Sequence, residues 1–131
     1  MARPKQETPT EGELEILKVL WERGPCTVRD VLEVLNSRRK RAYTSVMSLM
    51  NIMSEKGLVA RTPRGRAFIY AAKRPREKTL GKMVSHLLGR AFDGSASCLV
   101  SQVLDQSRPT SEELAEIRKA IDDYERGDPT R

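Results

Sequence analysis

The sequence is poor in cysteine, histidine and aromatic residues, and it contains no long hydrophobic run. Its 131 residues include two cysteines and one histidine, and aromatic residues make up 5%. Cys26 and Cys98 are far apart in the chain, so we expect ordinary thiols and no disulfide. For Cys98 we favour a buried thiol over the alternative of a redox switch. No apolar stretch approaches the ~18 residues of a membrane span, and the N-terminus has no hydrophobic signal core. We therefore expect a cytoplasmic protein with no membrane insertion.

Catalytic and metal-binding motifs are also missing from the sequence. His86 and the two cysteines do not have the spacing of a metal-ligand set. There is no glycine-rich phosphate loop and no nucleophile elbow. We therefore expect no enzymatic activity, no catalytic residue, no metal and no cofactor.

Positive charge is abundant but unevenly distributed along the chain, whose net charge is +6. Residues 1–78 hold 17 Lys/Arg against 9 Asp/Glu (+8), whereas residues 79–131 hold 7 against 9 (−2). Between residues 36 and 78 there are 12 cations and two acids (+10). Such a window favours a polyanion, and nucleic acid first. An acidic protein bound to the same basic face is the alternative.

The order of predicted elements in the first half is helix, helix, helix, hairpin. After a flexible arm (1–9), helices are predicted from Thr10 to about residue 23, from about residue 27 to 36, and over 42–56, where Gly57 ends the third. Strand-like runs at 58–59 and 68–70 surround a turn at Arg64–Gly65 and predict a hairpin. This order is typical of a winged helix-turn-helix, here spanning residues 10–74.

The second half is predicted to be helical over 75–126, with a flexible tail at 127–131. Its apolar residues recur at helical spacing, and the last helix has a short heptad seam. About 50 residues cannot bury so much apolar surface alone, so the helices pack either on the N-terminal domain or on a second copy. We favour the second copy. The candidate dimerisation residues are Leu80, Met83, Val84, Leu87, Leu88, Leu99, Val100, Val103, Leu114, Ile117, Ile121 and Tyr124.

The third helix carries short polar side chains on the face opposite its apolar one. With Val46 at the centre of the buried face, Thr44 and Ser48 fall on the far side and Ser45 on its flank. Such side chains, backed by cations, suit a helix that reads bases in a major groove; the alternative is an ordinary solvated surface. We expect the hairpin arginines to lie on the DNA backbone or in the minor groove. The candidate DNA-binding residues are Arg41, Thr44, Ser45, Ser48, Asn51, Arg61, Arg64 and Arg66.

Three stretches carry a family resemblance: TEGELEILKVLW (10–21), AYTSVMSLMNIMSEKGLVAR (42–61) and RGRAFIYAA (64–72). They resemble the BlaI/MecI/CopY-type penicillinase repressors, and GSASCLVSQVL (94–104) and TSEELAEIRKAI (110–121) are similar to the dimerisation helices of that family. The resemblance implies a mainly α chain with a small β-hairpin wing, an N-terminal winged helix-turn-helix and a C-terminal helical dimerisation region. It also implies a homodimeric repressor that binds double-stranded DNA at a two-fold operator through positions 44, 45 and 48.

The chain departs from the family pattern at several positions. Ser45 and Ser48 stand where Thr is commoner, and Ile52 stands where Arg is frequent. The resemblance implies a membrane-bound sensor protease as a partner, but its Asn-Phe cleavage signature is replaced by Gln102–Val103. Our hypothesis is that release does not use a cut at this bond, and an induced cut there, found by mass spectrometry, would contradict it. The Cys-x-Cys motifs of the copper-responsive branch are missing.

Overall fold

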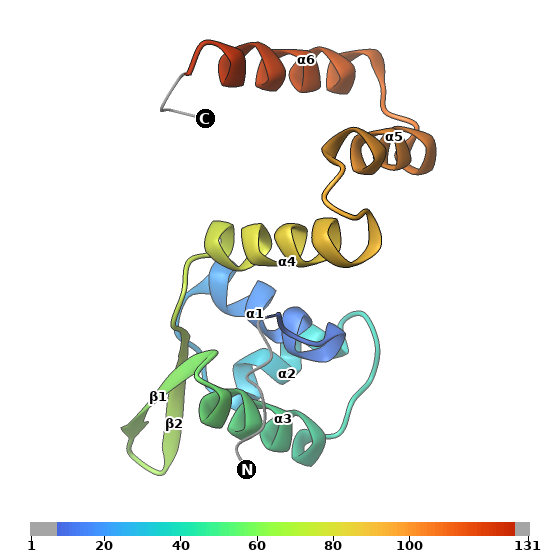
Figure 1. Cartoon of the computed structure of the whole chain (residues 1–131). Helices are drawn as coiled ribbons and strands as arrows, with labels where there is room; N and C mark the ends of the chain where they lie inside the picture. Colours follow the sequence, from blue (N-terminus) through green and yellow to red (C-terminus); the bar gives the residue numbers. More distant parts are fainter. Residues whose placement is uncertain (1–7, 128–131) are drawn as a thin grey trace. The chain divides into compact units, whose positions relative to one another are not determined.

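The computed structural model describes residues 8–127, which form six helices and one two-stranded antiparallel sheet (Figure 1). The elements are α1 (Glu11–Arg23), α2 (Val28–Asn36), α3 (Tyr43–Lys56), β1 (Val59–Arg64), β2 (Ala67–Ala72), α4 (Arg76–Ala91), α5 (Ala96–Ser107) and α6 (Ser111–Glu125). The predicted fold class, mainly α with one small hairpin, is confirmed. The predicted arm (1–9) and tail (127–131) fall mostly on residues 1–7 and 128–131, outside the described residues.

Short-range hydrogen bonds start the helices where the sequence predicted. At α1, the Thr10 Oγ1 accepts from the Glu13 N–H (3.3 Å) and the Glu13 carboxylate accepts from the Thr10 N–H (2.9 Å). Thr27 and Asp30 form the same reciprocal box at α2. At α6 the Thr110 Oγ1 accepts from the Glu113 N–H (3.1 Å). Each bond satisfies a backbone donor that the first helical turn leaves open.

The core of the first half is built by α1, α2, α3 and the hairpin. Its buried apolar residues are Ile16, Leu17, Val19, Leu20, Cys26, Val28, Val31, Leu35, Val46, Met50, Met53, Val59 and Tyr70. Val46, Met50 and Met53 form the buried face of α3, as the helical spacing predicted. Gly57 ends this helix in the left-handed conformation (φ +81°), which glycine adopts without a steric penalty. One face of α3 is therefore fixed by packing, and most side chains on its other faces are exposed.

The hairpin turns one residue later than predicted. The register pairs Val59 with Ala72 and Arg64 with Ala67, so the two turn residues are Gly65 and Arg66. Gly65 has φ +61°, and a glycine at the first of two turn positions is typical of a type II′ hairpin. The predicted turn at Arg64–Gly65 is therefore wrong by one position, because strand pairing extends to Arg64.

The chain forms two compact units, residues 1–86 and 87–131, and the boundary between them falls inside α4. In the second unit, α5 and α6 bury none of their residues. Asp93 (φ +49°) and Gly94 (φ +83°) lie in the turn after α4. No helix within residues 8–127 has the length and apolar character needed to cross a membrane.

Candidate nucleic-acid interface

Helix α3 presents two exposed rows of side chains beside its buried face. Thr44, Ser48 and Ile52 repeat at intervals of four and form the outer row, with Ser45 next to it. The predicted reading residues Thr44, Ser45 and Ser48 are all exposed. Ile52 is 44% exposed, so an apolar group lies in line with the polar ones. The outer row thus offers both hydroxyl groups and an apolar surface.

The second row of α3 faces the hairpin and contains Tyr43, Met47 and Asn51. The Asn51 Oδ1 accepts hydrogen bonds from the Tyr70 hydroxyl (2.9 Å) and from the Arg61 guanidinium (3.0 Å). The same guanidinium lies over the Phe68 ring, 4.4 Å from its centre. Asn51 and Arg61, both predicted to contact DNA, therefore also fix the hairpin against α3.

A groove of about 530 Å³ separates α3 from the hairpin. It is lined by Thr27, Val28, Arg29, Tyr43, Met47, Asn51, Arg61, Arg66, Ala67, Phe68 and Tyr70. Its charged side chains are three arginines, and no carboxylate of the described chain lines it. Arg29 lies 5.7 Å from the centre of the Tyr43 ring. The groove therefore combines positive charge with aromatic surface, which suits an anionic, partly apolar ligand such as a phosphodiester chain.

Sequence reasoning missed Arg29, Tyr43, Met47 and Phe68 as members of this surface. Tyr43 and Phe68 are about 40% exposed, at 41% and 39%. The i, i+4, i+8 spacing of Tyr43, Met47 and Asn51 was the available signal for a second exposed row on α3. Arg29 gave no signal, because its approach to α3 depends on how α2 packs.

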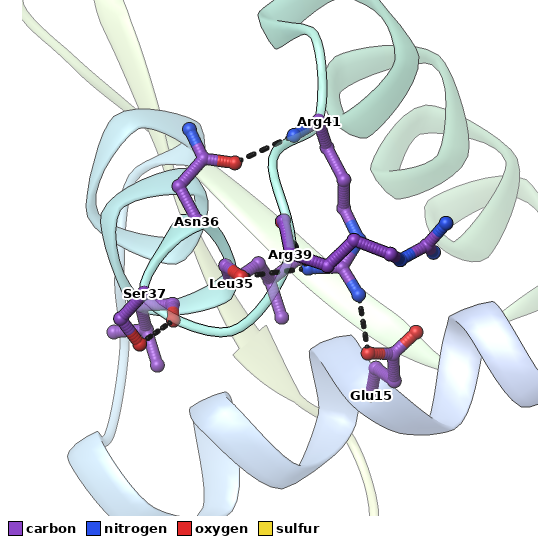
Figure 2. Close-up of polar contacts among 7 residues, drawn as sticks. Glu15, Leu35, Asn36, Ser37, Arg39 and Arg41 are labelled. Carbon is purple, nitrogen blue, oxygen red and sulfur yellow. Dashed lines mark hydrogen bonds and ion pairs between the residues drawn. The ribbon is translucent and has the colours of Figure 1, made fainter.

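Arg41 does not project outward as predicted (Figure 2). Its Nη2 atom lies 2.6 Å from the Glu15 carboxylate, and its Nη1 atom donates to the carbonyl oxygens of Leu35 (2.8 Å) and Arg39 (3.2 Å). Its side chain is only 14% exposed. The tertiary packing of α1 beside the α2–α3 turn draws this arginine inward, whereas Arg38, Arg39 and Lys40 are exposed. Its contact with DNA stays a prediction.

The hairpin tip holds the remaining predicted DNA contacts. Arg64 ends β1, Arg66 is the second turn residue, and both are exposed. Because they lie at the end of a two-stranded ribbon beside α3 (Figure 1), their charges extend the basic surface beyond the helix. The structure thus brings together the α3 rows, the groove and the hairpin tip in one unit.

The candidate dimerisation residues lie on α4, α5 and α6. Six of the large apolar ones are exposed in the single chain: Val84, Leu87, Val100, Val103, Ile121 and Tyr124, at 45–65%. The others, Leu80, Met83, Leu88, Leu99, Leu114 and Ile117, are partly exposed. Cys98 on α5 is exposed too, so its predicted burial is wrong for the single chain, in which α5 buries none of its residues.

Outside this surface, the buried carboxylate of Glu13 has a structural role. Burial raises the pKa of Glu13, but hydrogen bonds from Lys56 and Thr10 and the Lys56 charge outweigh it, so the pKa lies below its ordinary value. Among the residues that the structure describes, no three His, Cys, Asp or Glu side chains are placed to hold a metal ion.

Comparison with known proteins identifies a matching family and several similar proteins. The family model "Penicillinase repressor" matches residues 9–123. A transcriptional regulator BlaI of Mycobacterium tuberculosis is 33% identical over 123 residues, covering 92% of this chain and 88% of its own. A penicillinase repressor of Bacillus licheniformis is 19% identical, covering 88% of this chain and 90% of its own.

One solved structure supports the fold. The crystal structure of a transcriptional regulator from Thermotoga maritima matches 88% of this chain and 73% of its own, with a TM-score of 0.51 and 18% identity. At this identity the match concerns the fold alone. The match of the family model over most of the length carries the assignment: the chain belongs to the penicillinase repressor family.

Proposed function

We propose that this protein is a sequence-specific DNA-binding transcriptional repressor that acts as a homodimer on an inverted-repeat operator. The observation that carries the proposal is the set of exposed hydroxyl side chains on α3, Thr44, Ser45 and Ser48, beside an arginine-lined groove and a basic hairpin tip. Membership of a repressor family supports repression, rather than activation, of transcription. The other candidate, an adaptor whose basic face binds an acidic protein, has no comparable observation in its favour.

In this proposal α3 enters the major groove and its outer row reads base edges. Hydroxyl groups at positions 44, 45 and 48 can donate to or accept from bases, and the Thr44 methyl group can contact a thymine methyl. Ile52 adds an apolar contact of the same kind farther along the helix. The N-terminal half of a recognition helix makes most base contacts, which favours positions 44–48 as the main determinants of specificity.

The groove between α3 and the hairpin would hold the sugar-phosphate backbone. One strand must pass between a helix in the major groove and a hairpin at the adjacent minor groove. Arg29 and Arg66 would neutralise phosphates there, while Tyr43 and Met47 would contact the sugars. Arg64 at the hairpin tip would lie on the neighbouring backbone or in the minor groove.

A second copy of the chain is the occupant we propose for the apolar faces of α5 and α6. These helices bury no residue in the single chain, yet they carry Val100, Val103 and Ile121 on their surfaces. Pairing two copies would place two reading helices at half-sites separated by one turn of DNA or a multiple, ~34 Å per turn. A membrane-bound sensor protease as a further partner rests on the family resemblance alone.

The test is selection of bound duplexes from a random pool at about physiological salt, followed by sequencing. We expect an inverted repeat with fixed half-site spacing. A pool with no sequence preference, and binding that disappears as salt rises, would mean that the basic face acts only by electrostatics. That result would overturn the proposal and favour the acidic-protein partner.

A further inference from the structure

We infer that Arg41 and Glu15 form a positioning pair that fixes the recognition helix, and that Arg41 makes no phosphate contact of its own. This inference rests on the proposed function, because it concerns how α3 is held for reading DNA. It also changes the role that the sequence predicted for Arg41, from a member of the basic DNA-binding run to a link inside the protein.

The pair acts where α3 lacks a side-chain cap. The N-cap residue of α3 is Ala42, which makes no side-chain capping hydrogen bond. The start of the helix is fixed instead by the preceding residue: the Arg41 N–H donates to Asn36 Oδ1 (2.7 Å), and its guanidinium donates to the Leu35 carbonyl (2.8 Å). Arg41 thus ties the start of α3 to the end of α2 through both main chain and side chain.

Glu15 connects this junction to α1. Its carboxylate meets Arg41 Nη2 at 2.6 Å and is one-third exposed, whereas the arginine side chain is 14% exposed (Figure 2). A guanidinium held by a carboxylate and two carbonyl oxygens has most of its donors engaged and little surface open to a phosphate. One arginine therefore connects three helices.

The opposite end of α3 is held in the same way. The Lys56 ammonium lies 2.8 Å from the buried Glu13 carboxylate, again on α1. Helix α1 also passes close to the middle of α3. At Gly12 of α1, an added Cβ would lie only 3.3 Å from the Leu49 side chain. Two carboxylates of α1 thus hold the two ends of the recognition helix, and the close approach at Leu49 lies between those ends.

The direction in which one substitution changes the affinity for DNA distinguishes a positioning role of Glu15 from a purely electrostatic one. Removing an acidic charge from a protein that binds DNA strengthens binding if charge alone matters. Glu15→Gln should instead weaken binding to the selected duplex about tenfold, because α3 loses its fixed angle, and leave binding to a scrambled duplex unchanged or stronger. Glu22→Gln is the matched control: it makes the same charge change at an exposed position of the same helix, and it should not weaken specific binding.

The salt dependence of binding tests the second half of the inference. Arg41→Gln should lower the affinity for the selected duplex but leave the slope of log K against log salt unchanged. Lys40→Gln, at an exposed neighbour, should weaken both duplexes alike and make the slope shallower by about 0.9 for each phosphate that is no longer neutralised. A shallower slope for Arg41→Gln, with equal weakening on both duplexes, would overturn the inference. So would tighter specific binding by Glu15→Gln.

Amide hydrogen exchange of the free protein tests positioning without DNA. Glu15→Gln and Arg41→Lys should increase exchange in the first turn of α3, where Val46 donates to the Ala42 carbonyl, about tenfold over wild type. Glu22→Gln should leave it unchanged. Unchanged exchange in both pair variants would overturn the inference. If wild-type protein bound no duplex selectively, the proposed function would fail while this measurement still decided whether the pair holds α3.

Discussion

Glu13 is a carboxylate buried at 1% exposure in a domain of modest size. It accepts hydrogen bonds from the Thr10 N–H (2.9 Å) and from the Lys56 ammonium (2.8 Å). A buried charge is tolerated only when it is paired and hydrogen-bonded, and both conditions hold here. The side chain therefore serves the start of α1 and the end of α3 together.

Glu13→Gln should lower the free energy of unfolding at pH 7 by about 1–3 kcal/mol, because Lys56 loses its charged partner. The folded-state pKa of Glu13 is below its ordinary value of 4.5. Its stabilising effect is therefore complete above that pH and is lost as the pH falls through the folded-state pKa. Urea unfolding at a series of pH values should show the gap between wild type and variant narrowing in acid. A gap that stays constant with pH would contradict this assignment.

At the scale of elements, the proposed function assigns base reading to α3 and backbone contacts to the hairpin. Ser48→Ala should change the preference between related duplexes by about 1 kcal/mol, because alanine has no hydroxyl group to bond a base edge. Arg64→Ala combined with Arg66→Ala should weaken all duplexes alike and reduce the salt slope. Competition binding with a panel of single-base variants measures both effects. If Ser48→Ala left the preference unchanged, α3 would not be the reading helix through that position.

The elements themselves could be predicted because their signals are local. Thr10 and Glu13, or Thr27 and Asp30, are three residues apart and meet whatever the rest of the chain does. The inward turn of Arg41 could not be predicted, since Glu15 is 26 residues away and reaches it only after α1 and α3 cross. The exposed positions 44, 45 and 48 followed from helical periodicity alone.

At the scale of the whole molecule, the exposed apolar residues of α5 and α6 lead to a prediction about assembly. Wild-type protein should sediment at twice the mass of the 14.8 kDa chain, and Ile121→Asp should shift it towards the single chain, since a charge in an apolar interface is costly. Ala115→Asp adds the same charge at an exposed position about 120° around α6 from Ile121, outside the candidate pairing residues, and should leave the dimer intact. A dimer unaffected by Ile121→Asp would place the pairing surface elsewhere.

The candidate reading residues all fall between positions 41 and 66, and the candidate pairing residues between 80 and 124. After a gene duplication, substitutions in the first segment would change the operator while the second segment still paired old and new copies. Mixed dimers would then form and read asymmetric sites that neither parent binds well. A descendant with its own targets would need changes in α5 or α6 as well, so regulatory divergence in this architecture takes two steps.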